Sequence, residues 1–366
     1  MKLVINTANI LVGGAFQRAL SFVRELKEFG KDEYHIFYRS EFSEQVDISK
    51  YPTNFYFYLI DNSPASILNR KKVISRFNSL ESQIKPDLVF SFVGPAYWRP
   101  KSVHLVGFAV PHIVYDDLYY LKSSSIRTKL EMIYKKWWTK READYWVVQT
   151  QDVQDRLSNR IGVPTDKVFL VSNGPGKQYD DVVVKKKDAD SNIKKLLMIS
   201  TFRPSKNFEI IKQVAPLLKK DNYKYEFHIT IKEEDYNKHF LGFEETVINH
   251  GHVKAAECPE LYNDCDAMFL PSHLECFSAS YPEAMRMEKP ILTSDLPFAH
   301  TVCGDAALYF DNLSAEDIAN KIKLLFYNQD LYNDLIHKGK QQLGKFDTSK
   351  EQSKKYLDIC KRIVDN

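Results

Sequence analysis

Two acidic residues with a fixed spacing are the clearest sign of chemistry in this chain. Seven residues separate Glu275 from Glu283, and they form a turn followed by the expected start of a helix. Pro282 fits within the first helical turn, and Ser278 or Ser280 could cap the helix. Free backbone N–H groups at a helix start bind anions. The pattern predicts a bound diphosphate, with one carboxylate for the hydroxyl groups at either end. The alternative is a pair of acids on a solvated helix face.

A polar loop with two cations follows another expected strand. It runs from Ser200 to Asn207 and carries Thr201, Arg203 and Lys206. Positive charge in such a loop suits a departing diphosphate and can stabilise it without a metal. The alternative is that both cations are simply solvated. We expect Lys206 and Arg203 to take part in the reaction.

The region 251–311 resembles the donor site of the retaining glycosyltransferase family 4, which has the GT-B fold. The resemblance rests on the two glutamates and on the flanking stretches 259–262, 264–267, 288–295 and 304–308. It implies that Glu275 contacts the hydroxyls of the donor sugar and that Glu283 binds the ribose of the nucleotide. Further donor contacts would come from Thr201, Cys276, Phe277, Ser278, Ala279 and Val253.

The same resemblance extends to the cationic loop, with departures. Lys206 matches the lysine of the family, whereas Thr201 stands where arginine is frequent, and Arg203 could replace that arginine from two positions later. Cys276 and Ser278 replace glycines of the family, so side chains stand where a ligand normally approaches the backbone. Because of these departures, the sequence does not identify the donor sugar.

The first half of the chain carries weaker signals. Gly13 and Gly14 follow the first expected strand and resemble the glycine loop of the family, which contacts the donor; alone, such a pair can simply make a turn. His112 stands where family members place a histidine against the donor sugar, although a histidine in a turn is often only a surface residue. Tyr97 and Trp98 could stack against an acceptor sugar, but packing into the protein is the favoured interpretation.

Short apolar runs alternate with amphipathic stretches, a pattern typical of parallel α/β sheets. The expected strands are 3–6, 34–38, 54–60, 87–92, 103–109, 145–149 and 168–171, and then 196–200, 226–231, 247–249, 267–270, 291–293 and 307–310. Helices are expected at 16–29, 316–327, 331–344 and 348–364. The predicted fold is GT-B: two Rossmann-like, doubly wound domains facing across a cleft. We expect an acceptor-side domain at 1–175, a linker at 176–192, a nucleotide-sugar domain at 193–345 and a C-terminal helix, 346–366, that returns to the first domain.

Basic and aromatic residues alternate between positions 122 and 141. Seven cations and a single acid occur there before residue 142, with Tyr134, Trp137 and Trp138 among them. Such a composition suits the surface of an anionic bilayer. The alternative is a helix that packs Ile133 and Trp137 into the first domain. Single-stranded nucleic acid is a less favoured partner, because no accompanying motif supports it.

Composition limits the remaining possibilities. The chain of 366 residues is 44% hydrophobic and 27% charged, with a net charge of +3, so nothing global favours nucleic acid. Five cysteines lack metal-ligand spacing and are expected to be reduced thiols of a cytoplasmic protein. We find neither a signal peptide nor an apolar stretch that could span a bilayer, and the expected location is the cytoplasm, or peripheral attachment to the inner face of the membrane.

Together these observations predict a retaining glycosyltransferase that needs neither a metal nor a cofactor. Its donor would be a UDP- or GDP-sugar, and its acceptor a glycan or lipid-linked glycan, by family habit in bacterial surface-polysaccharide synthesis. Two alternatives stay open. One is a GT-B-fold sugar-nucleotide epimerase or phosphorylase, and the other is a non-catalytic sugar-nucleotide-binding protein.

Overall fold

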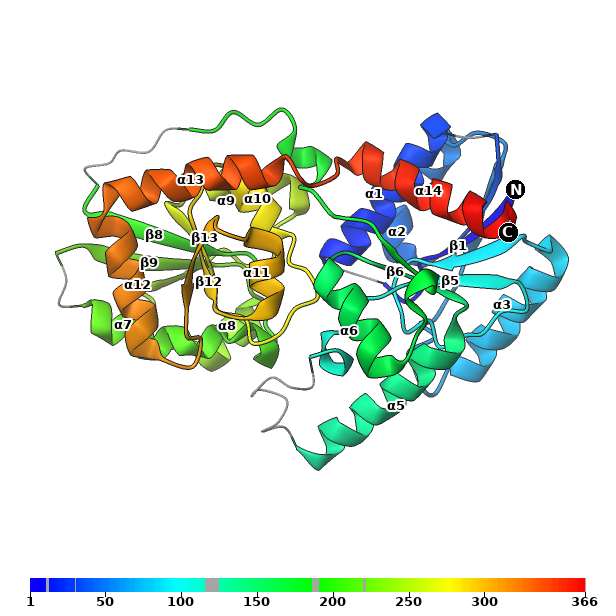
Figure 1. The fold of residues 1–366 in the computed structure, drawn as a ribbon, viewed down its shortest axis with the longest axis horizontal. Coiled ribbons are helices and arrows are strands. Elements are labelled where there is room, and N and C mark those ends of the chain that lie inside the picture. The colour runs from blue at the N-terminus through cyan, green and yellow to red at the C-terminus, as the bar shows by residue number, and fades with distance from the viewer. Residues whose placement is uncertain (11–12, 30, 116–124, 186–190, 220–221, 366) are drawn as a thin grey trace. The chain divides into compact units, whose positions relative to one another are not determined.

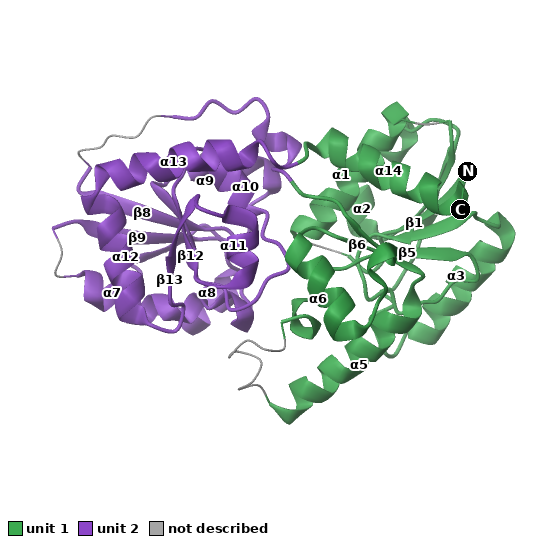
Figure 2. Ribbon diagram, viewed as in Figure 1, with its two compact units in different colours: residues 1–173, 347–366 green, residues 174–346 purple. Residues whose placement is uncertain are grey.

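The chain forms two compact α/β units (Figure 2). The computed structural model describes residues 1–10, 13–29, 31–115, 125–185, 191–219 and 222–365. Unit 1 comprises residues 1–173 and 347–366, and unit 2 comprises residues 174–346. Each unit is built on one parallel sheet, so the predicted fold class of two Rossmann-like units is confirmed.

The sheet of unit 1 has seven parallel strands in the order β3-β2-β1-β4-β5-β6-β7. The inner strands are buried and read as nearly continuous apolar runs, whereas the edge strands β3 and β7 are partly exposed. Their bounds are β1 Lys2–Asn6, β2 Glu33–Tyr38, β3 Phe55–Leu59, β4 Leu88–Ser91, β5 Val103–Gly107, β6 Tyr145–Val148 and β7 Val168–Leu170. The helices are α1 Gly14–Phe29, α2 Ser40–Ser43, α3 Arg70–Ile84, α5 Ile126–Glu142, α6 Gln151–Ile161 and α14 Ser349–Asp365.

The sheet of unit 2 has six parallel strands in the order β10-β9-β8-β11-β12-β13. The strands are β8 Ile193–Met198, β9 Lys224–Ile229, β10 Val247–Asn249, β11 Ala267–Leu270, β12 Ile291–Ser294 and β13 Ala307–Phe310. The helices are α7 Ile211–Leu218, α8 Glu233–His239, α9 Cys258–Asp264, α10 Ser280–Arg286, α11 Pro297–Cys303, α12 Ala315–Tyr327 and α13 Gln329–Leu343. In this strand order, the direction of winding reverses between β8 and β11, and ligands of such sheets bind at that point.

The last helix, α14, belongs to unit 1, as predicted, and lies beside α1 (Figure 1). Its Tyr356 is buried among aromatic side chains of the first core, with ring centroids 5.5–5.6 Å from those of Phe22, Phe90 and Phe92. The Ser172 hydroxyl also donates to the carboxylate of Asp347 at 2.8 Å. The end of the chain therefore completes the core formed by its beginning.

The described part of the expected linker packs on unit 2. Tyr179 is fully buried, and Arg286 of α10 donates to the carbonyls of Asp180 at 2.7 Å and Val182 at 3.2 Å. Residues 186–190 of that segment lie outside the described residues. Up to residue 182 the segment is thus bonded to α10.

Helix α5 exposes apolar side chains and buries polar ones, the reverse of an ordinary surface helix. Its buried residues are the polar Thr139 and Glu142, whereas Ile133 is 64% exposed and Trp137 is 47% exposed. The alternative that packs Ile133 and Trp137 into the domain is therefore wrong. Lys122, at the start of the predicted basic segment, lies outside the described residues.

Candidate active site

Lys206 and Glu275 form an ion pair on neighbouring loops of unit 2. Lys206 follows β8, and Glu275 follows β11, which is paired with β8 in the sheet. The two loops start on either side of the point where the winding of the sheet reverses, which brings them together. Only 16% and 12% of the two side chains are exposed, so water screens the pair weakly.

Buried hydrogen bonds fix the loop that carries Glu275. The hydroxyl of Ser272 donates to the Glu275 carboxylate at 3.0 Å. The carbonyl of the fully buried Ser272 accepts the hydroxyl of Ser294 at 2.7 Å and the side-chain amide of Asn312 at 3.1 Å. Since these partners come from β12 and from the segment after β13, the position of Glu275 is set by three parallel strands.

The Lys206 loop is tied to the same framework. The backbone N–H of His273 donates to the carbonyl of Ser205 at 2.8 Å. Asn207 adopts a left-handed φ of 55°, which asparagine tolerates better than most residues, and its amide donates to the carbonyl of Asn312 at 2.8 Å. Burial lowers the pKa of His273. The charged pair therefore sits between two loops that are bonded to each other.

The second glutamate, Glu283, lies on α10, a helix of seven residues. Pro282 is in its first turn, as predicted, but the residue before the helix is Ala279 and no side chain caps it, so the expected capping by Ser278 or Ser280 is wrong. The Ser280 hydroxyl donates to the carbonyl of Ile199 instead, at 3.5 Å. Glu283 is half-buried and accepts a hydrogen bond from Tyr262.

The loop between the two glutamates does not require glycine. Cys276 and Ser278 are both buried, and among the described residues neither is one of those with a left-handed backbone. Phe277 and Ala279 are partly exposed. The side chains that replace the family glycines are thus withdrawn from the surface.

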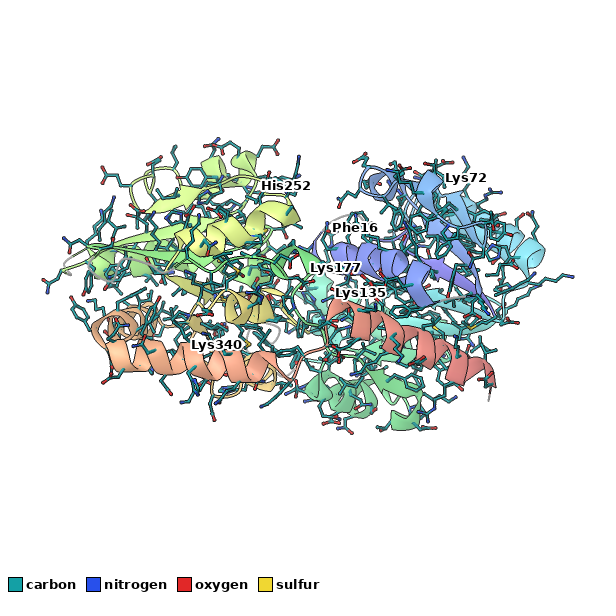
Figure 3. All side chains as sticks on the ribbon, turned by 90° about the horizontal axis from the view of Figure 1, so that it is seen from above. Phe16, Lys72, Lys135, Lys177, His252 and Lys340 are labelled. Atoms are coloured by element: carbon teal, nitrogen blue, oxygen red, sulfur yellow. The ribbon has the colours of Figure 1, made fainter. Side chains whose placement is uncertain are left out.

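The remaining candidates of unit 2 follow the ends of β8 and β10. Thr201 and Arg203 are exposed residues of the Lys206 loop. Val253 is partly exposed in the loop after β10, next to His252, which Figure 3 labels. A direct contact joins Lys206 to Glu275. Thr201 and Arg203 share the Lys206 loop, and Val253 lies at the same edge of the sheet.

The candidates of unit 1 also follow strand ends. Gly13 has a left-handed φ of 86°, where glycine is favoured, and Gly14 begins α1; residues 11 and 12 of that loop lie outside the described residues. Asn9 donates to the carbonyls of Val93 and Pro95, which ties this loop to the one after β4. His112 is partly exposed in a short 3-10 helix after β5.

Tyr97 and Trp98 have different surroundings. Trp98 is 1% exposed in the core of unit 1 and donates to Asn78 at 2.9 Å, so it has the favoured packing role and no free face for a sugar. Tyr97 is half-buried, with the Arg70 guanidinium 4.4 Å above its ring and Trp138 stacked at 6.3 Å.

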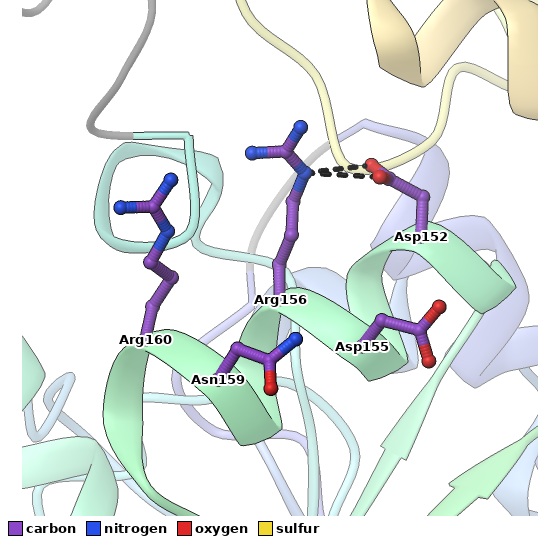
Figure 4. Close-up of a pocket in the computed structure, with 5 residues that line it drawn as sticks. All are labelled: Asp152, Asp155, Arg156, Asn159 and Arg160. Atoms are coloured by element: carbon purple, nitrogen blue, oxygen red, sulfur yellow. Dashed lines mark hydrogen bonds and ion pairs between the residues drawn. The ribbon is translucent and has the colours of Figure 1, made fainter.

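An open pocket lies along α6 in unit 1 (Figure 4), lined by Asp152, Asp155, Arg156, Asn159 and Arg160. Arg156 is already paired with Asp152 at 2.9 Å, and the Asp152 carboxylate also accepts the hydroxyl of Tyr115 at 2.5 Å. These bonds anchor the segment after β5 to α6, which is a structural role. In the part of the chain described here, we find no cluster of His, Cys, Asp or Glu that could hold a metal.

Comparison with known proteins decides the class of unit 2. The sequence model of the family Glycosyl transferases group 1 matches residues 181–342. Unit 2 carries a glycosyl transferases group 1 domain. The match includes Arg203, Lys206, Val253, Glu275 and Glu283, and it places the chain in the glycosyltransferase class of enzymes. No curated protein matches the sequence significantly.

Solved structures show the same fold over the whole chain. Sucrose-phosphate synthase from Thermosynechococcus elongatus has a TM-score of 0.77 and 13% identity and covers 99% of each chain. Anabaena Alr3699/HepE, solved with UDP and glucose, has a TM-score of 0.74 and 14% identity over 99% of this chain and 100% of that one. WaaG, a glycosyltransferase involved in lipopolysaccharide biosynthesis, has a TM-score of 0.74 and 12% identity over 98% and 99%. The glycosyl transferases group 1 domain is thus part of a GT-B fold.

Sequence reasoning missed the residues that support the candidate site. Ser272, Asn312 and His273 hold the charged loops, yet none belongs to a spacing pattern. Tyr262 stands in one of the stretches that resemble the family, but its role depends on a tertiary contact with Glu283. Only its place in the stretch Pro259-Glu260-Leu261-Tyr262 could have drawn attention to it.

Proposed function

We propose that this protein is a retaining glycosyltransferase that moves a sugar from a UDP- or GDP-sugar to a glycan or lipid-linked glycan acceptor. The observation that carries the proposal is the Lys206–Glu275 ion pair at the reversal point of the unit 2 sheet. A diphosphate would draw Lys206 toward its own charge, and the carboxylate of Glu275 would then accept hydroxyl groups of the donor sugar. Glu283 would accept the ribose hydroxyls.

In the proposed reaction, the bond between the anomeric carbon and the phosphate oxygen breaks while the acceptor hydroxyl attacks from the same face. The departing phosphate takes the proton of that hydroxyl. Lys206 and Arg203 stabilise the charge that develops on the diphosphate, and the protein otherwise orients the reactants. The contacts proposed for His112, Gly13 and Gly14 rest on the resemblance alone. We propose a cytoplasmic role in surface-polysaccharide synthesis on the same ground.

A panel of UDP-, GDP- and ADP-sugars tests this function. We expect one donor to raise the melting temperature and to be hydrolysed slowly without an acceptor, and Glu275→Ala to abolish hydrolysis while some nucleotide binding remains. Glu234→Ala, a change at an exposed acid of α8, is the matched control and should leave both unchanged. The anomeric configuration of the product, read by NMR, distinguishes retention from inversion. Failure of every donor to bind would refute the proposal.

Helix α5 supports a second part of the proposal, peripheral attachment to an anionic membrane. Its exposed apolar residues recur every three or four positions and therefore share one face: Ile126, Leu130, Ile133, Tyr134 and Trp137. The buried Thr139 and Glu142 lie roughly half a turn away on the opposite side. An apolar stripe that points away from its own core needs another apolar phase to cover it.

The charges beside the stripe favour a lipid surface as that phase. Exposed Lys129 and Lys140 lie on one flank, and Arg127 and Arg141 lie on the other. Glu131 projects elsewhere and is paired with Lys135 at 2.6 Å. Each cation near an anionic bilayer contributes about 1 kcal/mol, and tyrosine and tryptophan favour the interface.

Vesicles of neutral lipid, with and without anionic phosphatidylglycerol, test the attachment. Co-sedimentation should require the anionic lipid and should fall about tenfold or more in the triple change Lys129→Gln, Lys136→Gln, Lys140→Gln. Leu130→Ser with Ile133→Ser should weaken binding without changing the charge. Lys135→Gln serves as the control, because that lysine is already paired with Glu131 (its side chain is labelled in Figure 3). Equal binding to neutral and anionic vesicles, or none to either, would contradict the proposal.

A further inference from the structure

Two buried tyrosines lie behind the ribose-binding candidate Glu283. Tyr262 of α9 and Tyr179 of the 3-10 helix Lys177–Tyr179 are almost completely withdrawn from water. Their ring centroids are 6.0 Å apart, with the rings at 68° to each other. The Tyr262 hydroxyl reaches the carbonyl of Ser280 at 3.3 Å and the Glu283 carboxylate at 3.4 Å. One phenol therefore already contacts Glu283 from its buried side.

The second phenol is placed to do the same. The Tyr179 hydroxyl is buried and makes no hydrogen bond of ordinary geometry with any residue that the structure describes. It nevertheless lies close enough to Glu283 for that carboxylate to add to the effect of burial, which raises the pKa of Tyr179 well above its ordinary value. A buried hydroxyl without a partner costs stability, and phenylalanine would fill the same space without that cost.

The position of Tyr179 is fixed by the helices that carry its two neighbours. Arg286, three residues after Glu283 on α10, holds the carbonyls of Asp180 and Val182. On α9, the amide of Asn263, the residue after Tyr262, donates to the carbonyl of Val183 at 3.1 Å, and its oxygen accepts the N–H of Lys185 at 3.0 Å. The segment that follows Tyr179 is thus hydrogen-bonded to both α9 and α10.

We propose that Tyr262 and Tyr179 are positioning residues for the donor nucleotide, which hold the Glu283 carboxylate from behind and leave its outer lone pairs to the two ribose hydroxyls. The inference rests on the ribose-binding role proposed for Glu283. A carboxylate has about four lone-pair positions, so two phenol donors and a vicinal diol can be satisfied together. On donor binding, a small turn of Glu283 gives the Tyr179 hydroxyl its missing acceptor. The ligand class recognised by this layer is a nucleoside diphosphate with an intact ribose diol.

Conservative substitutions separate this role from a structural one. In the full-length chain, Tyr179→Phe should raise the melting temperature by about 2–4 °C, because the unpaired hydroxyl is removed. The same change should weaken binding of UDP or GDP, whichever the wild type binds, about three- to tenfold by calorimetry. Tyr262→Phe should weaken nucleotide binding similarly and lower the melting temperature. Tyr332→Phe removes another buried phenol bond, to the Asp266 carbonyl at 2.7 Å, and should leave nucleotide affinity unchanged.

The ligand series locates the effect on the ribose. Inorganic diphosphate and the 2′,3′-dideoxy nucleoside diphosphate lack the diol, so the tyrosine variants should bind each of them as tightly as the wild type does. A stabilised Tyr179→Phe with unchanged nucleotide affinity would overturn the inference, as would equal losses with the dideoxy ligand. If the wild type binds nucleotide and Glu283→Ala weakens it while the tyrosine variants do not, only this inference fails. If the wild type binds no nucleotide, the proposed function fails with it.

Discussion

Lys206 and Glu275 are 69 residues apart in the chain and are paired in space, with the Ser272 hydroxyl as a further donor to the same carboxylate. The pair depends on strand order, because β8 and β11 are neighbours in the sheet although two strands separate them in sequence. In the absence of donor, each charge neutralises the other. Under the proposed function, a bound diphosphate would compete with Glu275 for Lys206, and this competition makes the pair testable.

Removing the lysine should affect activity and stability separately. Lys206→Ala leaves the Glu275 carboxylate without its counter-charge, and we expect a loss of about 1–3 kcal/mol in unfolding free energy. Donor hydrolysis should fall about 10²–10³-fold, the usual effect of losing one group that stabilises developing charge. Urea unfolding and a coupled assay for the released nucleoside diphosphate measure the two.

A double variant provides the control. Lys206→Ala with Glu275→Gln has no buried charge left, so it should recover most of the lost stability while remaining inactive. Lys232→Ala, at an exposed lysine before α8, should change neither property. Full activity in Lys206→Ala would contradict the role proposed for the pair.

Glu142, at the end of α5, should make the stability of unit 1 depend on pH. Burial raises the pKa of this carboxyl from an ordinary value of 4.5 to about 8, despite hydrogen bonds from Trp138 at 2.6 Å and the N–H of Ala96 at 2.8 Å. Between these values the folded state keeps a proton that the unfolded chain has lost, so stability falls as the pH rises. The loss should be about 1.4 kcal/mol per pH unit.

Comparison with a variant that does not titrate separates this carboxyl from its neighbour His104. Burial lowers the pKa of His104 from 6.5 to about 4, so its opposite contribution, a gain of stability with rising pH, flattens only about one pH unit above 6.5 and is shared by wild type and variant. Urea unfolding between pH 6.5 and 8 should show a decline in the wild type that is absent in Glu142→Gln, which keeps an acceptor oxygen but does not titrate. Parallel curves for the two proteins would contradict the prediction.

Gly107, the last residue of β5, is expected to tolerate no side chain. A Cβ atom there would lie 2.0 Å from the carbonyl oxygen of Phe92, a backbone atom held by the neighbouring strand. Gly107→Ala should therefore cost at least about 3 kcal/mol or prevent folding, as severe overpacking does. Gly339 lies inside α13, and a Cβ atom there would meet Met285 of α10 at an ordinary 3.5 Å. Gly339→Ala should therefore raise the free energy of unfolding by about 0.5–1 kcal/mol. Thermal unfolding of both variants tests the contrast.

The fold could be predicted because buried parallel strands consist of short apolar runs, which are visible in the local sequence. Val247–Asn249, Ala267–Leu270 and Ala307–Phe310 have the predicted bounds, and the others differ by a few residues. The strand predicted over 103–109 ends at Gly107, whose carbonyl turns to the N–H of Gly94 at 2.6 Å, a contact with no local signal. This bound was set by a tertiary contact.

The site was only partly predictable for the same physical reason. The spacing of Glu275 and Glu283 and the loop of Lys206 made these three residues candidates, and the structure pairs Lys206 with Glu275. The Tyr179 hydroxyl behind Glu283, the bond from Ser272 to Glu275, and the outward apolar face of α5 arise from packing between segments far apart in sequence. In α5 the sequence permitted both an inward and an outward Trp137, because an amphipathic pattern does not state which side meets the core.

Unit 1 should depend on the last helix, α14, more strongly than unit 2 does. Tyr356 is buried against three aromatic residues from α1, β4 and the segment after β4, so Tyr356→Ala should cost about 3–5 kcal/mol. Because this core belongs to unit 1, limited proteolysis should cleave within 1–173 before it cleaves within 174–346. Nucleotide binding by unit 2 should survive under conditions where unit 1 has opened. Lys354→Ala on the exposed side of the same helix is the matched control and should behave as the wild type does. Simultaneous cleavage of both units in Tyr356→Ala would mean that the stability of unit 2 is coupled to this core, contrary to the division of the chain into two compact units.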